Sequence, residues 1–235
     1  MRLLLFSNST NPGQGFLEHG NEEIKKILGR KPGRILFIPY AAVTLSYDVY
    51  FDKVKEKFRS LGYTIDSIHL TDDPGKALKE SECIVVGGGN TFHLLQQIQK
   101  NNLTKAVANC VKSGALYIGW SAGANLACPT IRTTNDMPII ETENLKGFNL
   151  IPFQINPHYT DKQIEGHGGE SRDMRIEEFL KLNQQKYVIG LREGSSLKIE
   201  AEKITLLGKQ GARLFKYGNP SSELTGKDDI SFLLG

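Results

Sequence analysis

The stretch LYIGWSAGANLA, residues 116–127, decides the fold prediction because an apolar run passes directly into a turn of small residues. Within it, residues 119–123 match G-x-S-x-G, the strand-to-helix turn whose glycines allow a sharp bend and leave the serine hydroxyl exposed. A serine between glycines also suits a tight packing turn. The pattern therefore makes Ser121 a candidate nucleophile and does not by itself identify one.

Short apolar runs on both sides of this stretch alternate with amphipathic segments. We expect strands at residues 2–6, 34–40, 64–70, 83–86 and 115–119, and helices at residues 21–28, 47–61, 91–100 and 103–113. This alternation is typical of β-α-β units. It predicts an α/β fold with a mostly parallel sheet flanked by helices.

The C-terminal part of the chain has a different pattern. After an apolar run near residue 153, a helix is expected at residues 172–183 and a strand at residues 187–191. Residues 196–218 alternate apolar and polar side chains around turn-like segments, which predicts antiparallel hairpins added to the sheet. Because no linker or repeat interrupts the chain, we expect residues 1–235 to form a single domain.

Composition excludes several classes of partner. The 29 Lys and Arg residues and 26 Asp and Glu residues are interspersed, so neither nucleic acid nor a membrane surface is an expected partner. No apolar stretch approaches the roughly 20 residues that span a bilayer. The three cysteines, Cys83, Cys110 and Cys128, lie in or beside apolar segments, which favours free thiols and the cytoplasm.

A serine nucleophile requires a base and an acid that orients the base. His158 directly follows a short apolar run and is the best candidate for the base. Glu193 follows the strand expected at residues 187–191 and is the candidate acid, while Asp136 is the competing one. Each of these residues also has an ordinary structural interpretation, such as a turn residue or a buried histidine.

The positions of these candidates along the chain reinforce one another. The serine, the histidine and the glutamate each follow the carboxyl end of an expected strand, which is the edge where open α/β sheets bind ligands. The strand at residues 83–86 delivers a glycine run to the same edge. The backbone N–H groups of Gly88, Gly89 and Ala122 are therefore the expected donors to a developing oxyanion.

Cofactor and metal sites are not expected. The glycine run has Phe92 where a dinucleotide fingerprint requires its third glycine, and it lacks the G-K-S/T of a P-loop. A cluster of His158, Glu165, His167 and Glu170 matches no spacing typical of a metal site.

Seven motifs, taken together and in this order, resemble the peptidase E family of serine peptidases, the α-aspartyl dipeptidases. They are LLLFSNST (3–10), VVGGGNTFHLL (85–95), GWSAGAN (119–125), TTNDMPI (133–139), INPHYTD (155–161), EGHGGESRDMRI (165–176) and GLREGS (190–195). The resemblance implies a fold like that of class I glutamine amidotransferases. It also implies cleavage of Asp-Xaa dipeptides, with Ser121 as nucleophile, His158 as general base and Glu193 as the acid.

The resemblance also implies roles in substrate binding. Arg172 is the implied partner of the aspartyl carboxylate, while Asn90 and Asp136 fall on motif positions that contact substrate or support the site. Without the resemblance, Arg172 would be interpreted as a surface residue paired with Glu177.

The sequence departs from the family pattern beside the glutamate. Arg192 stands where we expect proline, and GSSL follows Glu193 where an aromatic residue is common. Two alternatives stay open: a hydrolase of another aspartyl amide or isopeptide, as in cyanophycinase-like relatives, and a non-catalytic binding protein. The expected partner is a small Asp-Xaa peptide, and the expected assembly is a monomer or homodimer.

Overall fold

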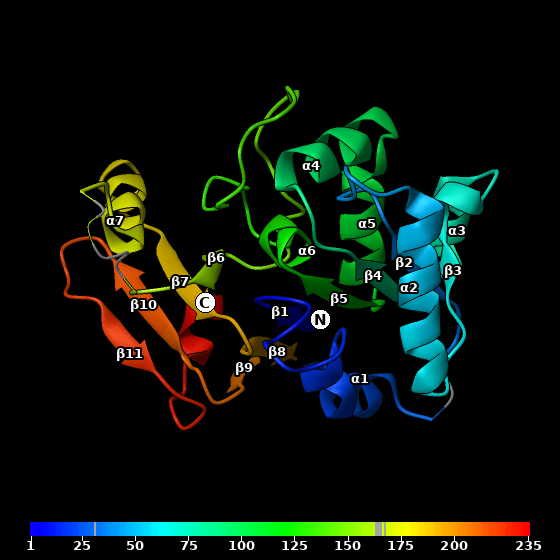
Figure 1. The fold of residues 1–235 in the computed structure, drawn as a ribbon, viewed down its shortest axis with the longest axis horizontal. Helices are drawn as coiled ribbons and strands as arrows, with labels where there is room; N and C mark the ends of the chain where they lie inside the picture. The colour runs from blue at the N-terminus through cyan, green and yellow to red at the C-terminus, as the bar shows by residue number, and fades with distance from the viewer. Residues whose placement is uncertain (31, 163–165, 167) are drawn as a thin grey trace.

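The computed structural model describes residues 1–30, 32–162, 166 and 168–235, which contain two β-sheets (Figure 1). The larger sheet has the strand order β3 (Asp66–Ser67), β2 (Ile35–Ile38), β4 (Cys83–Val86), β5 (Leu116–Trp120), β1 (Arg2–Phe6), β8 (Ser196–Glu200) and β9 (Lys203–Leu207). The first five strands of this order are parallel, and β8 and β9 continue the sheet antiparallel. The predicted mostly parallel sheet is confirmed.

Helices cover both faces of the larger sheet (Figure 1). On one face lie α3 (Pro74–Lys79), α4 (Thr91–Lys100), α5 (Leu103–Lys112) and α6 (Ala122–Leu126). On the other face lie α1 (Asn21–Leu28) and α2 (Tyr47–Ser60). Short 3₁₀ helices occupy Glu18–Gly20, Ile68–Leu70 and Ser231–Leu234. In the described part of the chain, no helix is both long and apolar enough to cross a membrane.

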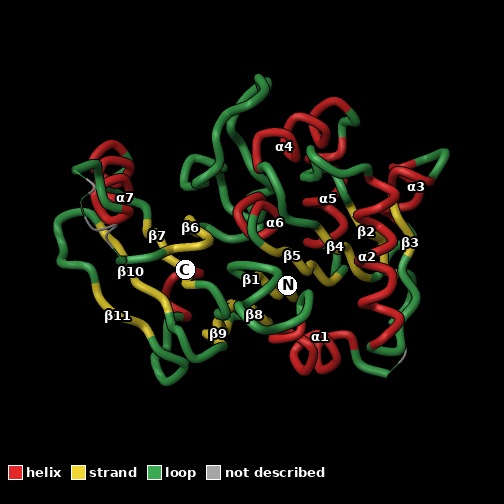
Figure 2. The backbone as a smooth tube through the Cα atoms, in the orientation of Figure 1, coloured by secondary structure: helices red, strands yellow, loops and turns green. Residues whose placement is uncertain are grey.

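The smaller sheet carries the candidate site residues from the C-terminal part of the chain. Its strand order is β11 (Ser222–Leu224), β10 (Ala212–Lys216), β7 (Tyr187–Arg192) and β6 (Gln154–Tyr159), with α7 (Arg172–Leu182) packed against it. Strands β6 and β7 are parallel, and the other pairs are antiparallel. Figure 2 shows the two groups of strands, in yellow, meeting near the middle of the molecule.

Two expectations about strands need correction. The strand expected at residues 64–70 pairs only at Asp66–Ser67, because the chain then forms a 3₁₀ turn that buries Ile68 completely. The second correction concerns the antiparallel hairpins expected at residues 196–218, of which only the β8–β9 hairpin joins the larger sheet. Between β9 and β10 the chain turns at Gly208 (φ 94°) and Gly211 (φ 67°), conformations that favour glycine, and β10 then pairs with β7.

The two sheets share a hydrophobic core. Leu3 and Tyr117 of the larger sheet belong to the same buried cluster as Ile155 and Ile189 of the smaller sheet, and all four are 0% exposed. The carboxyl ends of β1, β5, β6 and β7 are therefore held in a fixed relation by buried packing, and these are the ends that carry the candidate site residues.

Candidate active site

Ser121 lies in a strained turn between β5 and α6. Its backbone has φ 53° and ψ −114°, and its N–H donates to the Phe6 carbonyl at 3.0 Å. A Cβ on Gly123 would lie 2.2 Å from the Val86 carbonyl oxygen, and one on Gly119 would lie 2.6 Å from that of Gly123. Both glycines of the G-x-S-x-G pattern are thus required by close backbone approach.

His158 and Glu193 meet Ser121 from the smaller sheet. His158 Nε2 lies 2.8 Å from Ser121 Oγ, and His158 Nδ1 lies 2.6 Å from Glu193 Oε1. His158 has φ 54° at a register shift in β6, and this bulge directs its ring toward the serine. The structure thus brings the predicted nucleophile, base and acid into one chain of hydrogen bonds.

Asp136 makes other contacts. Its Oδ2 accepts from the Thr91 N–H at 2.7 Å, from the Thr91 hydroxyl at 2.5 Å and from the Thr134 hydroxyl at 3.2 Å. These bonds attach the loop after α6 to the start of α4. Glu193, rather than Asp136, is therefore the acid in contact with His158.

Asn90 caps α4. Its Oδ1 accepts from the His93 N–H at 3.0 Å, and its Nδ2 donates to the Met137 carbonyl at 2.9 Å. Both ends of the amide thus already have partners, so a contact between Asn90 and substrate stays a prediction.

The glycine loop after β4 lies directly beside Ser121. A Cβ on Gly88 would lie 2.9 Å from the Ser121 Cβ, and Gly89 has φ 143°, a conformation that favours glycine. Among the described residues, the N–H groups of Gly88, Gly89 and Ala122 have no backbone acceptor. The Gly88 carbonyl is held by the Tyr50 hydroxyl at 3.0 Å, which fixes the loop.

Arg172 begins α7 and points toward the loop after α6. Its NH1 donates to Asn135 Oδ1, and Asn135 Nδ2 donates at 2.6 Å to the carbonyl of Pro157, the residue before His158. Partial burial, followed by the neighbouring Arg175, lowers the pKa of the Arg172 guanidinium. The structure gives Arg172 the Asn135 contact in place of the surface pair, and within the described ranges no ion pair joins Arg172 to Glu177.

Two residues that sequence reasoning did not assign hold the site together. The Ser7 hydroxyl accepts from the His158 N–H at 2.8 Å and donates to the Leu191 carbonyl at 2.7 Å. Asn8 Oδ1 accepts from the Gly194 N–H at 2.8 Å. Both residues follow β1, so their place at the carboxyl edge of a strand was the available signal.

The possible metal cluster lies partly outside the described residues, which omit Glu165 and His167. In the part of the chain that the structure describes, no group of three His, Cys, Asp or Glu side chains could hold a metal ion. Arg192, the departure from the family pattern, turns away from the site to Asp161 and Glu223, and Glu193 still reaches His158.

Comparisons with known proteins show which family the chain resembles. Residues 3–207 match peptidase family S51. Peptidase E of Nostoc sp. is 50% identical over 233 residues, covering 99% of this chain and 96% of the relative. Peptidase E of an Escherichia coli strain is 46% identical over 225 residues, covering 95% and 97%.

A solved structure shows the same fold. A peptidase from an acI-B1 actinobacterium superimposes with a TM-score of 0.74 at 22% identity, covering 98% of this chain and 96% of the other. At that identity the likeness supports the fold alone. With the family match over most of the chain and the two close relatives, the chain belongs to peptidase family S51.

Proposed function

We propose that the chain is a serine exopeptidase that hydrolyses dipeptides with an N-terminal aspartate, Asp-Xaa, through an acyl-enzyme on Ser121. The observation that carries the proposal is the chain of hydrogen bonds from Ser121 through His158 to Glu193. Relatives named Peptidase E, similar over nearly their full length, support the same activity.

Acylation follows from the positions of the three side chains. With a proton on Nδ1 directed at Glu193, the His158 Nε2 accepts the proton of the Ser121 hydroxyl as Oγ attacks the aspartyl carbonyl. Glu193 keeps the imidazole in this tautomer and stabilises the imidazolium that forms. The nucleophile is thus activated without a metal or cofactor in any step.

Breakdown of the tetrahedral intermediate uses the same groups in reverse. The N–H groups of Gly88, Gly89 and Ala122 are the proposed donors to the oxyanion, because Ala122 follows Ser121, Gly88 lies against it, and none of the three has a backbone acceptor among the described residues. His158 returns its proton to the leaving amine, which releases Xaa. A water molecule activated by His158 then hydrolyses the ester and releases aspartate.

Selectivity for aspartate is assigned to Arg172. A planar guanidinium binds a carboxylate through two parallel hydrogen bonds, and partial burial of Arg172 strengthens such a pair. Asn135 holds the guanidinium on the side of His158, so the carboxylate would be bound at a fixed distance from the reacting carbonyl. Glu-Xaa, with one more methylene, would place its carbonyl out of register.

The partners and location follow the same proposal. The substrates are small Asp-Xaa peptides, and neither nucleic acid nor a membrane is a partner. The chain works in the cytoplasm, where Cys83, Cys110 and Cys128 stay as free thiols. We propose a monomer or homodimer.

A kinetic panel tests the proposed function. Purified protein is given Asp-Leu, Glu-Leu, Asn-Leu and the β-aspartyl isomer of Asp-Leu, and released amine is measured with and without EDTA. Asp-Leu alone should be hydrolysed rapidly, and EDTA should have no effect. Faster hydrolysis of the β-aspartyl peptide than of Asp-Leu would contradict the proposal. A loss of activity in EDTA that added zinc restores would also contradict it.

A further inference from the structure

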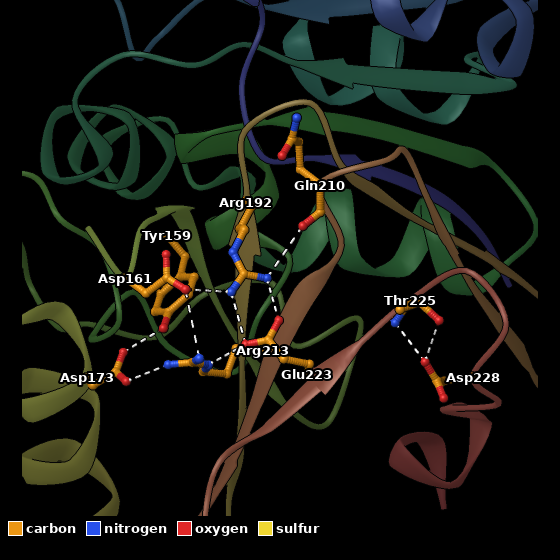
Figure 3. A network of polar contacts seen from close by, with 9 residues as sticks. All are labelled: Tyr159, Asp161, Asp173, Arg192, Gln210, Arg213, Glu223, Thr225 and Asp228. Carbon is orange, nitrogen blue, oxygen red and sulfur yellow. Dashed lines mark hydrogen bonds and ion pairs between the residues drawn. The ribbon is translucent and has the colours of Figure 1, made fainter.

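A cluster of five charged side chains joins the smaller sheet to α7 (Figure 3). We call it the charge cluster; its members are Asp161, Asp173, Arg192, Arg213 and Glu223. The two guanidinium groups converge on one carboxylate: Arg213 Nε lies 2.6 Å from Glu223 Oε1, and Arg192 NH1 lies 2.8 Å from Glu223 Oε2. Arg192 also donates to Asp161 at 3.0 Å.

Arg213 connects the smaller sheet to α7. Its NH1 lies 2.9 Å from Asp173 Oδ2, and the Tyr159 hydroxyl donates to the other oxygen of the same carboxylate at 2.6 Å. Arg213 comes from β10 and Asp173 from the first turn of α7, so one side chain joins the sheet to the start of the helix. Figure 3 shows these contacts as a continuous path.

Two members of the charge cluster are chain neighbours of proposed site residues. Asp173 directly follows Arg172, the proposed carboxylate-binding residue. Arg192 directly precedes Glu193, the proposed triad acid. Arg213 contacts neither Arg172 nor Glu193 directly. It connects to Arg172 through its ion pair with Asp173, and to Glu193 through Arg192, with which it shares the Glu223 carboxylate.

We propose that Arg213 is a positioning residue for the reaction, which fixes Arg172 through Asp173 and fixes Glu193 through Glu223 and Arg192. This inference rests on the proposed function of the site. It goes beyond that function because Arg213 sets the distance between the carboxylate-binding residue and the triad.

The charge cluster is suited to this role because its two guanidinium groups are mostly buried and each bonds to more than one carboxylate. The Arg192 and Arg213 side chains are 17% and 23% exposed, while their partners Asp161 and Glu223 are 44% and 52% exposed. Bonds from Arg192 hold the pKa of Asp161 and that of Glu223 below their usual values. Loosening such a support by about 1 Å costs roughly 10²-fold in rate when it misplaces reacting groups.

The test uses Arg213→Met in the full-length protein. This substitution keeps the aliphatic part of the side chain and removes the guanidinium group. We expect kcat/KM for Asp-Leu to fall about 10- to 100-fold. The preference for Asp-Leu over Asn-Leu should also fall, because Arg172 is no longer held. The labelling rate of Ser121 by a small fluorophosphonate depends on His158 and Glu193 and not on binding of the aspartyl carboxylate. This rate should fall as well. Arg213→Lys should recover part of each loss, since it keeps charge without the fork.

Arg34→Met is the matched control. Arg34 is 31% exposed and makes two ion pairs, 2.9 Å to Asp66 and 3.0 Å to Glu80, far from the site on the larger sheet. If the charge cluster only stabilises the fold, both variants should lower the unfolding midpoint and neither should change the preference for aspartate. We expect Arg34→Met to leave that preference at the wild-type value.

A double-mutant cycle decides whether Arg213 acts through Arg172. In an Arg172→Ala background, Arg213→Met should leave the remaining Asp-over-Asn preference unchanged. A further loss of the same size in that background, or an unchanged preference in the single variant, overturns the proposal.

Two further outcomes are distinguishable. If Arg213→Met does not fold, Asp173→Asn removes the same ion pair and should cause the same loss of preference; an unchanged preference there also overturns the proposal. A wild-type protein that does not hydrolyse Asp-Leu would instead contradict the proposed function. An active wild type with an unaffected Arg213→Met would contradict only the inference.

Discussion

Two backbone conformations at single residues create the site. Ser121 and His158 both have positive φ, 53° and 54°, values that cost non-glycine residues free energy unless their surroundings impose them. At Ser121, the N–H bond to Phe6 and the tight packing of the flanking glycines impose the conformation. At His158, the bond from its N–H to the Ser7 hydroxyl does so. Strain at both positions therefore directs the hydroxyl and the imidazole toward each other.

The first prediction concerns the triad acid. Glu193→Gln should lower kcat for Asp-Leu by up to about 10⁴-fold, because the amide no longer holds the required tautomer of His158. Asp136→Asn is the matched change in the competing acid. It should alter kcat less than about tenfold, since Asp136 contacts Thr91 and Thr134 instead. The reverse order of effects would show that Asp136 serves the histidine during turnover.

The second prediction concerns selectivity. Arg172→Ala should lower kcat/KM for Asp-Leu by roughly 30-fold to several thousand-fold, which is about 2 to 5 kcal/mol for a desolvated carboxylate left unpaired. The rate of Ser121 labelling by a fluorophosphonate should change little, because the triad is untouched. An unchanged preference for Asp-Leu over Asn-Leu would mean that another side chain binds the carboxylate.

Much of the site could be predicted at this scale, and the reason lies in the strand ends. Ser121, His158 and Glu193 each follow an apolar run, and parallel strands bring such positions to one edge. The contacts of Asn135 could not be predicted, because neither its bond to Arg172 nor its bond to Pro157 leaves a local pattern. The choice between Glu193 and Asp136 likewise depended on loop geometry.

At the scale of elements, the end of β1 joins the two sheets. Ser7 bonds to both β6 and β7, and the preceding Phe6 carbonyl accepts from Ser121 after β5. The nucleophile belongs to the larger sheet and its base to the smaller one. The turn after β1 therefore controls how these two parts of the site meet.

The third prediction tests the contacts that Ser7 makes with β6 and β7. Ser7→Ala leaves the partly buried His158 N–H and the buried Leu191 carbonyl without their partner, which should cost about 1 to 3 kcal/mol of the free energy of unfolding. Since His158 is no longer held, kcat should fall about tenfold or more. The control is Ser60→Ala, whose hydroxyl bonds to Lys57 on the surface. Urea unfolding and Asp-Leu kinetics measure both effects, and an unchanged kcat would contradict the role of Ser7.

The elements show why periodicity predicts some strands and not their grouping. The runs at residues 2–6 and 83–86 coincide with β1 and β4, since strands covered on both faces are continuously apolar. The edge strand near residue 66 is short because Ile68 enters the core from a turn. The separation of β10 from β9 depends on positive φ at two glycines, which alternation of apolar residues does not indicate.

At the scale of the whole molecule, the two sheets share one buried cluster, so we expect residues 1–235 to behave as a single domain. The fourth prediction is that urea unfolding is one cooperative transition. Fluorescence of Trp120, the only tryptophan, reports the larger sheet, while far-UV circular dichroism reports both sheets. The two curves should coincide. Separate midpoints would show that the smaller sheet unfolds by itself.

Active-site titration with a fluorophosphonate tests whether Ser121 is the nucleophile. We expect one adduct per chain, located on Ser121 by mass spectrometry, with loss of Asp-Leu hydrolysis in proportion to labelling. Ser121→Ala protein should neither label nor turn over, since loss of such a nucleophile costs about 10⁶-fold in kcat. Full Asp-Leu hydrolysis by completely labelled protein, or by the Ser121→Ala variant, would contradict the assignment of Ser121 as the nucleophile.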